Sequence, residues 1–573
     1  MRKVGPGQAD IAANRTGEGT RMKKIGVASF AMLLAAATAF SGCTKQNTAE
    51  SPAKGSEDPK ASQAPSASPV KEEGYSLPIV KDGSVTLRYG GWDNWYAPAS
   101  LSQNLPVWQE IEKRTGVKIK WEVAPVAQYT TSMQAKLAAA KDLPDIIALP
   151  IELSKAIESG VIEPLDELIN KYAPNIKKFM ADNPTEFNKM KAPDGKLYSL
   201  AAVTTGGAMT DPFGFLIRKD WLDKLGLQEP KTLDDWYNAL KAIKEKDPNG
   251  NGKADEIPFM PQYGYKGLGM FGNALGLHLF YSNGYYPDEN GKVRFEWMTP
   301  EAKELVVWLN KLYKEGLIDP GFLQKTEETI IAGISRDQVG STIHFLSRAG
   351  QFDTLAQQAG ASNANWLLTI PPAQPGYKPH YEKYGPISGN WVISKESKNK
   401  EAAIKWLDYI YASEEGNRLV TFGIEGVSYK MVNGEPEYMD FVMKNPDGLD
   451  PANTLRSIGA YPPTPWIRAA KGPLSKSPAA LLKNNPKSLE QAKRVESMMV
   501  DNEPFAVITA QEIEELAFVS ADMQTYIDET IVNFITGKEP IDWEKFTAKL
   551  KQYGIEKILK VSQQQYDRFI NKQ

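Results

Sequence analysis

The stretch from residue 85 to residue 149 decides the fold, because three apolar segments in it alternate with two helical ones. The predicted strands are VTLRYG (85–90), VKIKWEV (117–123) and PDIIAL (144–149), and the second alternates as a strand with one covered face does. Residues 105–115, which end before Gly116, and residues 130–141 are the predicted helices. This strand–helix–strand–helix–strand order predicts a parallel, doubly wound α/β lobe.

The residues before this lobe have the composition of an export signal followed by a tether. Arg21, Lys23 and Lys24 precede an apolar stretch at 25–40, which is shorter than the roughly 20 residues of a membrane-spanning helix. We interpret residues 1–42 as a leader. Residues 43–76 are rich in Ser, Ala, Pro, Lys and Glu, and we interpret them as a disordered tether because they offer almost no apolar surface to bury.

The single Cys of the chain, Cys43, directly follows Ser41 and Gly42. This arrangement resembles a bacterial lipoprotein signal, in which the Cys becomes the lipidated amino terminus after cleavage. Phe40 departs from the usual pattern, which has Leu there. The resemblance implies an exported protein anchored to the outer face of the bacterial cytoplasmic membrane. The alternative is a buried free thiol within an ordinary membrane helix.

Composition excludes several classes of protein. The 573 residues carry 67 Lys and Arg against 70 Asp and Glu, so no basic surface indicates nucleic acid. One Cys excludes a disulfide scaffold and a Cys-based zinc cluster, and the three His are far apart in sequence. GLGMFG (267–272) fits a dinucleotide fingerprint, but loop residues precede it instead of a strand, so we interpret it as a flexible turn.

Several further segments carry a resemblance to a known family: KLYSL (196–200), FLIRKDWLDKLGL (215–227), TPEAKELVVWLNKLYKEGLIDP (299–320), AAIKWLDYIYASEEG (402–416) and FGIEGVSY (422–429). In this order they resemble the lipoprotein branch of family 1 extracellular solute-binding proteins, which serve ABC importers. The resemblance implies a periplasmic-binding-protein-like α/β fold in which two lobes, each a doubly wound sheet flanked by helices, are joined by a hinge.

The same resemblance gives expected lobe boundaries. It places the crossings between lobes near residues 203–213, 338–343 and 386–392. The N-terminal lobe would then comprise 77–205 and 340–388, and the C-terminal lobe would comprise 206–339 and 389–573.

Aromatic residues, which make up 10% of the chain, gather with polar ones near predicted strand ends and crossings. Flat rings stack on the apolar faces of sugars, and polar side chains bind the hydroxyl groups. The alternative for each aromatic residue is ordinary packing. The candidate ligand-binding residues are Trp92, Asp93, Asn94, Trp95, Tyr96, Tyr263, Tyr265, Arg348, Asn390 and Trp391.

These observations favour a monomeric binding protein that captures a carbohydrate, most simply an oligosaccharide, for ABC permease subunits. An anchored polysaccharide-active enzyme and a permease-independent glycan-sensing or adhesion lipoprotein are the alternatives. A glycosidase needs two carboxylates, but a chain with 70 acidic residues always offers a pair, so Glu425 and Asp211 carry no weight as candidates. We therefore expect no enzyme.

A calcium site is the last expectation. DPNGNGKADE (247–256) follows a helix with a predicted capping box at Thr232 and Asp235, and it matches the first half of an EF-hand loop. Pro258 stands where an EF-hand has its last Glu, so Asp255 or Glu256 would have to complete the oxygen ligands. The alternative is a polar turn without an ion. The candidate ligands are Asp247, Asn249, Asn251, the Lys253 carbonyl, Asp255 and Glu256.

Overall fold

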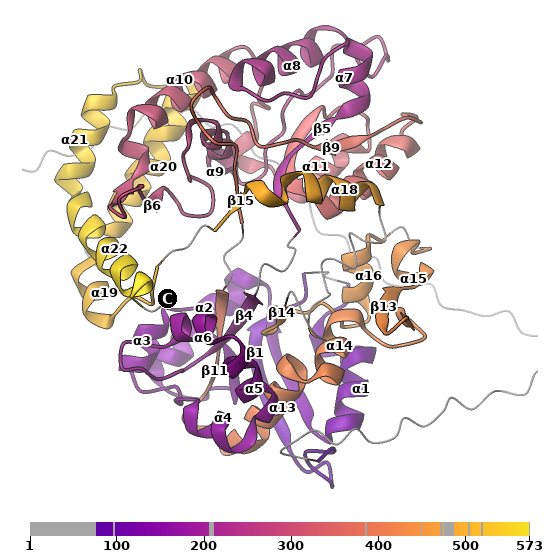
Figure 1. The fold of residues 1–573 in the computed structure, drawn as a ribbon, viewed down its shortest axis with the longest axis vertical. Coiled ribbons are helices and arrows are strands. Elements are labelled where there is room, and N and C mark those ends of the chain that lie inside the picture. Colours follow the sequence, from indigo (N-terminus) through magenta and orange to yellow (C-terminus); the bar gives the residue numbers. More distant parts are fainter. Residues whose placement is uncertain are drawn as a thin grey trace, which may run out of the picture. The chain divides into compact units, whose positions relative to one another are not determined.

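The structure is a computed structural model of the chain (Figure 1), and it describes residues 76–95, 98–205, 211–383, 387–446, 449–469, 474, 486–501, 505–516 and 519–571. The predicted leader, most of the tether and Cys43 lie outside these residues. Within them, no helix combines the length and the apolar character needed to cross a membrane.

The first lobe is built on a six-stranded sheet with the order β14-β4-β11-β3-β1-β2. Its strands are β1 (Thr86–Trp92), β2 (Lys118–Ala124), β3 (Ile146–Ala148), β4 (Leu200–Thr205), β11 (Ile387–Ile393) and β14 (Ile467–Ala469). β11 runs antiparallel to both its neighbours, and the other strands run parallel to one another. The predicted doubly wound lobe is therefore present, with one reversed strand inserted into it.

Helices and one hairpin surround this sheet, and α13 packs against α4, α5 and α14. The helices are α1 (Pro106–Thr115), α2 (Val126–Ala139), α3 (Leu153–Glu158), α4 (Asp166–Tyr172), α5 (Pro174–Asp182), α6 (Pro184–Met190), α13 (Lys400–Ala412), α14 (Glu414–Phe422), α15 (Asp440–Met443) and α16 (Pro451–Ser457). The hairpin is β12 (Tyr429–Val432) with β13 (Glu435–Tyr438).

The second lobe has a different sheet. β5 (Phe213–Arg218) lies between β8 (Ser341–Phe345) and β9 (Trp366–Leu368) and is antiparallel to both. Single parallel bridges extend this sheet from β8 through Met260 and Phe259 to Ile318. The second lobe is thus a mixed sheet, and the expectation of a second doubly wound sheet is wrong for its central strands.

The remaining elements of the second lobe are mostly helices, and the carboxyl-terminal helices pack on α10 and on β7. The helices are α7 (Lys219–Leu225), α8 (Leu233–Glu245), α9 (Gly264–Gly269), α10 (Pro300–Lys314), α11 (Glu327–Ile334), α12 (Ala349–Gln358), α18 (Pro486–Val495), α19 (Ala510–Leu516), α20 (Ser520–Thr536), α21 (Trp543–Tyr553) and α22 (Ile555–Ile570). Two short strand pairs complete it: β6 (Tyr285–Pro287) with β7 (Val293–Phe295), and β10 (Tyr381–Glu382) with β15 (Met499–Val500).

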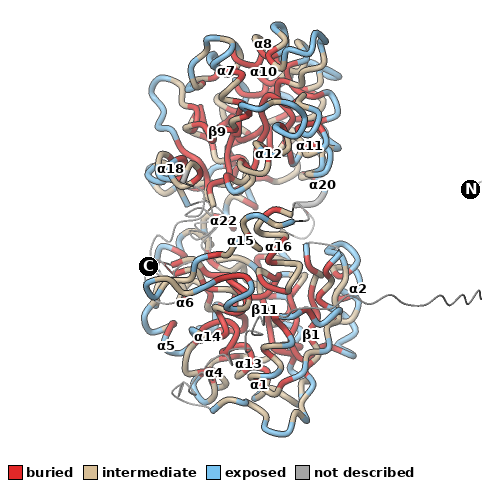
Figure 2. Tube along the Cα trace, turned by 90° about the vertical axis from the view of Figure 1, so that its right-hand side faces the viewer, coloured by how far each residue is buried: buried red, intermediate tan, exposed pale blue. Residues whose placement is uncertain are grey.

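Two separate hydrophobic cores define which segments belong to which lobe (Figure 2). One core takes its residues from 87–203 and 391–469, and the other takes them from 213–381 and 492–558. The predicted assignment of 340–388 to the N-terminal lobe and of 389–469 to the C-terminal lobe is therefore wrong. β8 pairs with β5 instead of forming a crossing near 338–343, and the third passage between cores lies between residues 469 and 492.

Local signals in the sequence agree with the structure more closely. Gly116 ends α1 in the left-handed conformation, at φ 70°, where a side chain would also strike the Val80 carbonyl. The capping box of Thr232 and Asp235 is present at the start of α8. The glycines of 267–272, however, are not a turn, because they lie buried within α9 and the 3-10 helix Met270–Leu275 that follows it.

Candidate functional site

Parallel strands of the first lobe end at a common edge of the sheet, which we call the strand-end edge. β1 ends there at Trp92, β4 at Thr205 and β14 at Ala469. Loops after the carboxyl ends of parallel strands are where doubly wound lobes bind ligands. The strand-end edge is therefore the place to look for a binding surface.

The loop after β1 presents one tryptophan to solvent. Trp95 is 54% exposed. Asp93 organises the loop, since its carboxylate accepts hydrogen bonds from the backbone N–H of Leu101 at 2.9 Å and from the Ser100 hydroxyl at 2.7 Å. Asn94 holds the loop from the other side by donating to the Ala99 carbonyl at 2.6 Å. These two predicted polar ligands thus position the loop, and Tyr96 lies outside the described residues.

Two other predicted tryptophans lie next to each other. The rings of Trp92 and Trp391 have centroids 5.8 Å apart, and Trp92 also lies 6.5 Å from Tyr129. Trp391 is only 4% exposed, and its ring covers Gly389, where a Cβ atom would come within 2.7 Å of it. Trp92 is half-buried, so part of this residue is accessible to a ligand, and the tilted ring of Trp391 packs beside it.

Asn390 joins strands together. Its side-chain oxygen accepts the Ser199 hydroxyl at 2.8 Å, and its backbone carbonyl accepts the Leu149 N–H at 2.8 Å. These bonds tie β11 to the segments next to β4 and β3. A ligand contact by Asn390 remains a prediction.

The second lobe contributes its own aromatic residues. Tyr263 is 51% exposed, and its ring centroid lies 5.9 Å from that of Phe213 and 5.7 Å from that of Phe280. Phe345 lies 4.9 Å from Phe213 on the neighbouring strand. Tyr265 is different, because it is 8% exposed and its hydroxyl donates to Asp528 on α20, so it belongs to the core.

Arg348 is held in two ion pairs. Its guanidinium lies 2.7 Å from Glu327 of α11 and 2.7 Å from Asp450, which caps α16 in the first lobe. Beside it, Asp211 accepts the Ser347 N–H at 3.0 Å, and burial raises the pKa of this carboxyl to about 6. Arg348 therefore connects the two lobes in this structure, and a role in binding ligand remains a prediction.

The predicted calcium loop follows α8 directly. Asp247 has φ 46°, and its carboxylate accepts the N–H groups of Gly250, Asn251 and Gly252 at 3.0–3.1 Å. Asn251 accepts the Lys253 N–H at 2.7 Å. The loop is thus folded around its own oxygen atoms, as a cation-binding loop has to be.

At the carboxyl-terminal end of this loop, one acidic side chain lacks hydrogen-bond partners. Both carboxylate oxygens of Glu256 are buried and have no hydrogen-bond partner. Burial raises the pKa of Glu256, and the nearby charges of Asp247 and Asp255 raise it further. Asp255 accepts amide hydrogens from Asn251 at 3.0 Å and from Gln338 at 3.0 Å.

A partnerless buried carboxylate among Asp, Asn and carbonyl oxygens fits a hard divalent cation such as Ca²⁺. Within the described residues, however, no three His, Cys, Asp or Glu side chains converge as a metal cluster. The fit thus depends on amide and carbonyl oxygens as much as on carboxylates.

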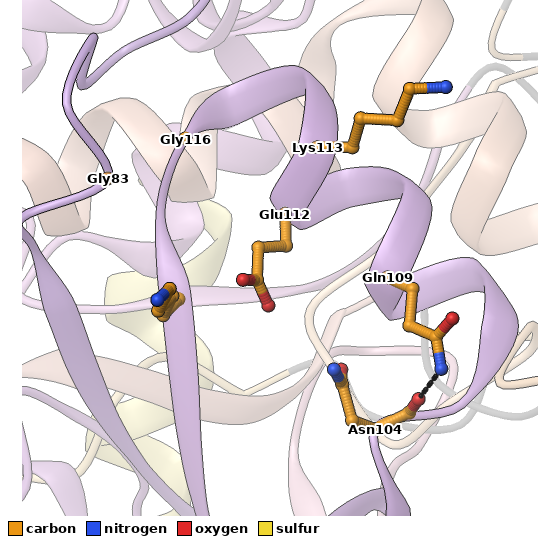
Figure 3. Close-up of a pocket in the computed structure, with 7 residues that line it drawn as sticks. Gly83, Asn104, Gln109, Glu112, Lys113 and Gly116 are labelled. Atoms are coloured by element: carbon orange, nitrogen blue, oxygen red, sulfur yellow. Dashed lines mark hydrogen bonds between the residues drawn. The ribbon is translucent and has the colours of Figure 1, made fainter.

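A surface cavity of about 360 Å³ lies elsewhere, next to the carboxyl end of α1 and the start of β2 (Figure 3). Its lining residues are Gly83, Asn104, Gln109, Glu112, Lys113, Gly116 and Lys118. Since β2 begins here and ends at the strand-end edge, this cavity lies at the opposite end of the sheet. It contains none of the predicted ligand-binding residues.

Two α/β lobes with separate cores, joined by repeated passages of the chain and carrying exposed aromatic rings beyond strand ends, define a two-lobed binding protein. The chain belongs to the family of bacterial extracellular solute-binding proteins, whose pattern matches residues 99–417.

Known proteins resemble the chain along most of its length. It is 28% identical to the fructooligosaccharide ABC transporter substrate-binding protein FusA of Streptococcus pneumoniae serotype 4, over 94% of this chain and 98% of that one. It is 27% identical to lipoprotein LipO of Bacillus subtilis (strain 168), over 59% of this chain and 66% of that one. The crystal structure of the alginate-binding protein AlgQ2 without calcium ion matches with a TM-score of 0.71 and 25% identity, over 87% of this chain and 100% of that one.

The structure also brings residues to the strand-end edge that the sequence analysis missed. Arg456 lies with its guanidinium 5.1 Å from the centroid of the Trp95 ring, and Arg468 lies 3.9 Å from that of Trp466. The segment YPPTPWIR (461–468) gave a local signal, since it combines aromatic residues and an arginine next to a strand. Nothing local connects Arg456 with Trp95, which is far away in sequence.

Proposed function

We propose that this protein is a lipid-anchored substrate-binding protein of an ABC importer, and that it captures an oligosaccharide between its lobes for delivery to the permease subunits. The observation that carries the proposal is the exposed ring of Trp95, held by Asp93 and Asn94 beyond the end of β1. An exposed, positioned aromatic ring suits the apolar face of a sugar. The similarity to FusA, which is named for binding fructooligosaccharides, supports a carbohydrate ligand.

In this proposal the two lobes supply two walls. Trp92 and Trp95 belong to the first lobe, and Tyr263, Phe280 and Phe345 belong to the second. The ligand binds one wall, the lobes close, and the permease binds the closed form. The protein releases the sugar chemically unchanged. The alternative, a polysaccharide-active enzyme, would cleave it, so mass spectrometry of the sugar after long incubation with the protein distinguishes the two.

Calorimetry and thermal shift against a panel of oligosaccharides test the function. A tight ligand stabilises the folded state, so at least one member of the panel should raise the melting temperature. Trp95→Ala should then weaken binding of that ligand at least tenfold, equivalent to about 1.4 kcal/mol.

Tyr377→Ala is the matched control, because Tyr377 is 38% exposed and belongs to neither wall. This variant should bind as the unmodified protein does. A panel in which no saccharide binds would contradict a carbohydrate ligand, and equal affinities for the Trp95 and Tyr377 variants would contradict stacking on Trp95.

The proposal includes a calcium ion in the loop 247–256. Asp247, Asn249, Asn251, the Lys253 carbonyl, Asp255 and Glu256 would hold it, and the partnerless carboxylate of Glu256 supports this assignment. The ion would stabilise the loop. Calcium should raise the melting temperature relative to chelator, and magnesium should do so less because it requires a smaller, stricter octahedron.

Asp247→Ala should remove the difference between calcium and chelator without abolishing sugar binding. Asp288→Ala is the matched control, since Asp288 also accepts two backbone N–H groups in an exposed turn but has no partnerless carboxylate beside it. Identical melting curves in calcium and chelator would count against the ion.

The anchor is proposed at Cys43, which follows the signal-like segment 25–42. The similarity to lipoprotein LipO supports it. In a bacterial host, Cys43→Ala should move the protein from the membrane fraction to the medium, or leave the precursor uncleaved. Unchanged membrane retention of a processed Cys43→Ala protein would contradict lipid anchoring.

A further inference from the structure

Two arginines of the first lobe share a set of aromatic rings. Arg456 of α16 and Arg468 of β14 place their guanidinium groups 5.5 Å and 5.8 Å from the centroid of the Tyr461 ring. Arg456 also lies 5.1 Å from the Trp95 ring, and Arg468 lies 3.9 Å from the Trp466 ring. We call these five residues the arginine–aromatic group.

The arginine–aromatic group lies at the strand-end edge. In the pairing of β14 with β4, Arg468 is opposite Thr204, one residue before both strands end. The side chain of Asn94 donates to the Arg456 carbonyl at 2.9 Å, so the loop that carries Trp95 is joined to α16. The group therefore continues the surface to which the proposed function assigns the sugar.

Among the described residues, the two arginines have carboxylates nearby but none in contact: Asp450 acts on Arg456, and Arg468 acts on Asp211, only through longer-range electrostatic attraction. Arg456 donates from Nη1 to the neutral side chain of Asn453 at 2.9 Å, while its Nε is buried without a hydrogen-bond partner. Arg468 donates from Nη2 to the Tyr461 hydroxyl at 2.7 Å. Neither guanidinium forms an ion pair with any carboxylate of the described chain. Asp450, the acid that caps α16, is paired with Arg348 instead.

Both arginines are partly buried. A partly buried cation that touches no carboxylate is incompletely solvated, and an anionic partner in contact with it would lower this cost. A guanidinium binds a carboxylate with two parallel hydrogen bonds, which suits a planar anion better than a hydroxyl group. The exposed face of Trp95 beside Arg456 would accept the apolar face of the ring that bears the carboxylate.

We propose that Arg456 and Arg468 form a carboxylate subsite, and that the ligand is an acidic oligosaccharide containing uronic acid residues. This inference rests on the proposed function, because it names the class of sugar that the same surface binds. The arginines bind the carboxylate, and the aromatic rings bind the sugar ring that carries it.

Matched sugars separate this inference from the proposed function. The full-length mature protein would be titrated with uronic acid trisaccharides of several linkages, and with the carboxyl-reduced form of each, which has the same linkages without charge. We expect at least one uronate to bind ten- to a hundredfold more tightly than its reduced form, with an affinity that falls as salt rises.

Variants assign the preference to the two arginines. Arg456→Gln and Arg468→Gln should each lower the ratio of uronate affinity to reduced-sugar affinity at least fivefold. Arg456→Lys keeps the positive charge but lacks the planar pair of donors, so this variant should retain part of the preference for the uronate. Arg294→Gln is the control, since Arg294 is an exposed arginine of β7 in the other lobe.

Melting curves of each variant would exclude misfolding, and Arg468→Gln tests the subsite independently if Arg456→Gln does not fold. Reduced trisaccharides that bind as well as the uronates would overturn the carboxylate subsite and leave the carbohydrate function standing. A preference for uronates that survives both Gln substitutions would also overturn it. Failure of every sugar to bind would overturn the inference and the proposed function together.

Discussion

The side chain of Glu256 destabilises the folded protein when no cation is bound and would stabilise it by binding one. Both of its carboxylate oxygens are buried without a hydrogen bond, and burial raises its pKa. An acid with a raised pKa in the folded state destabilises the fold as pH rises through that pKa, because the charged form is then forced on a buried group. At neutral pH, Glu256 is therefore a cost that a bound cation would remove.

Glu256→Gln tests this explanation, because the substitution should stabilise the protein in chelator and weaken the stabilisation by calcium. In chelator at neutral pH, the variant should be more stable than the unmodified protein by about 1 kcal/mol, because the buried charge is gone. In calcium, it should lose most of the stabilisation that the unmodified protein gains. Calorimetric melting under both conditions measures this, with exposed Glu289→Gln as the control. The explanation would be contradicted if Glu256→Gln melted at a lower temperature than the unmodified protein in chelator and calcium raised the melting temperatures of both proteins equally.

His380 makes the second residue-scale prediction. It is 6% exposed and stacks on His278 at a centroid distance of 4.5 Å. Burial, assisted by His278, lowers the pKa of His380 from 6.5 to about 4. Between these pH values His380 is protonated in the unfolded chain but not in the folded chain. The free energy of unfolding must therefore fall as pH falls from about 6.5 to about 4.

His380→Gln should remove this contribution. The difference in unfolding free energy between the unmodified protein and the variant should shrink by up to about 1.4 kcal/mol per pH unit across that window, and it should be constant above pH 7. Urea unfolding at a series of pH values measures it. Parallel pH profiles for the two proteins would contradict the assignment.

At the scale of elements, α8 explains how the loop 247–256, the proposed calcium site, is positioned. Its capping box fixes the start of the helix, its apolar side is buried in the second core, and the loop leaves from its last turn. Thr232→Ala should therefore destabilise the protein by about 1 kcal/mol, since it removes the acceptor for the Asp235 N–H. Thr232→Ser keeps the acceptor and should restore most of that loss in urea unfolding. Equal stability of the Ala and Ser variants would contradict a capping role.

Elements also show what sequence can predict here and what it cannot. β1, α1, β2, α2 and β3 follow one another, so periodicity and the Gly116 stop signal predict each of them within a few residues. β11 inserts between β3 and β4 from a segment almost 200 residues away, and no local pattern identifies those partners. The misplaced lobe boundaries at 340–388 result from this, because β8 and β11 both look like buried strands and only their pairing assigns them to a lobe.

In the candidate site, too, features built from consecutive residues can be predicted from the sequence, and features built from distant segments cannot. The acidic loop 247–256 can be recognised from the sequence because its candidate oxygen ligands come from ten consecutive residues. The arginine–aromatic group cannot be, because α16 and β14 reach the loop of Trp95 only through the fold. Asp93, Asn94 and Asn390 are predicted ligand contacts, and the structure shows that they hold loops and strands in place. Their contact with a ligand stays a prediction.

At the scale of the whole molecule, a few contacts connect the two cores. Arg348 and Asp450 form one of them, with side chains 13% and 5% exposed and 2.7 Å between charged atoms. A mostly buried pair is little screened by salt, and removing one partner leaves the other unpaired. This ion pair should therefore couple the stability of the second lobe to that of the first.

A double-mutant cycle of Arg348→Gln and Asp450→Asn measures this coupling. Asn caps a helix as well as Asp does, so Asp450→Asn removes the charge but keeps the hydrogen bonds to Ala452 and Asn453 that start α16. We expect a coupling energy of about 0.5–3 kcal/mol in unfolding, and a larger radius of gyration of each single variant by small-angle X-ray scattering. Glu327→Gln is the control, because Glu327 pairs with Arg348 inside the second lobe and should change stability without changing the radius. Strictly additive free energies, or unchanged scattering, would show that Arg348 and Asp450 do not hold the lobes together, and the lobe closure proposed above would then not depend on this ion pair.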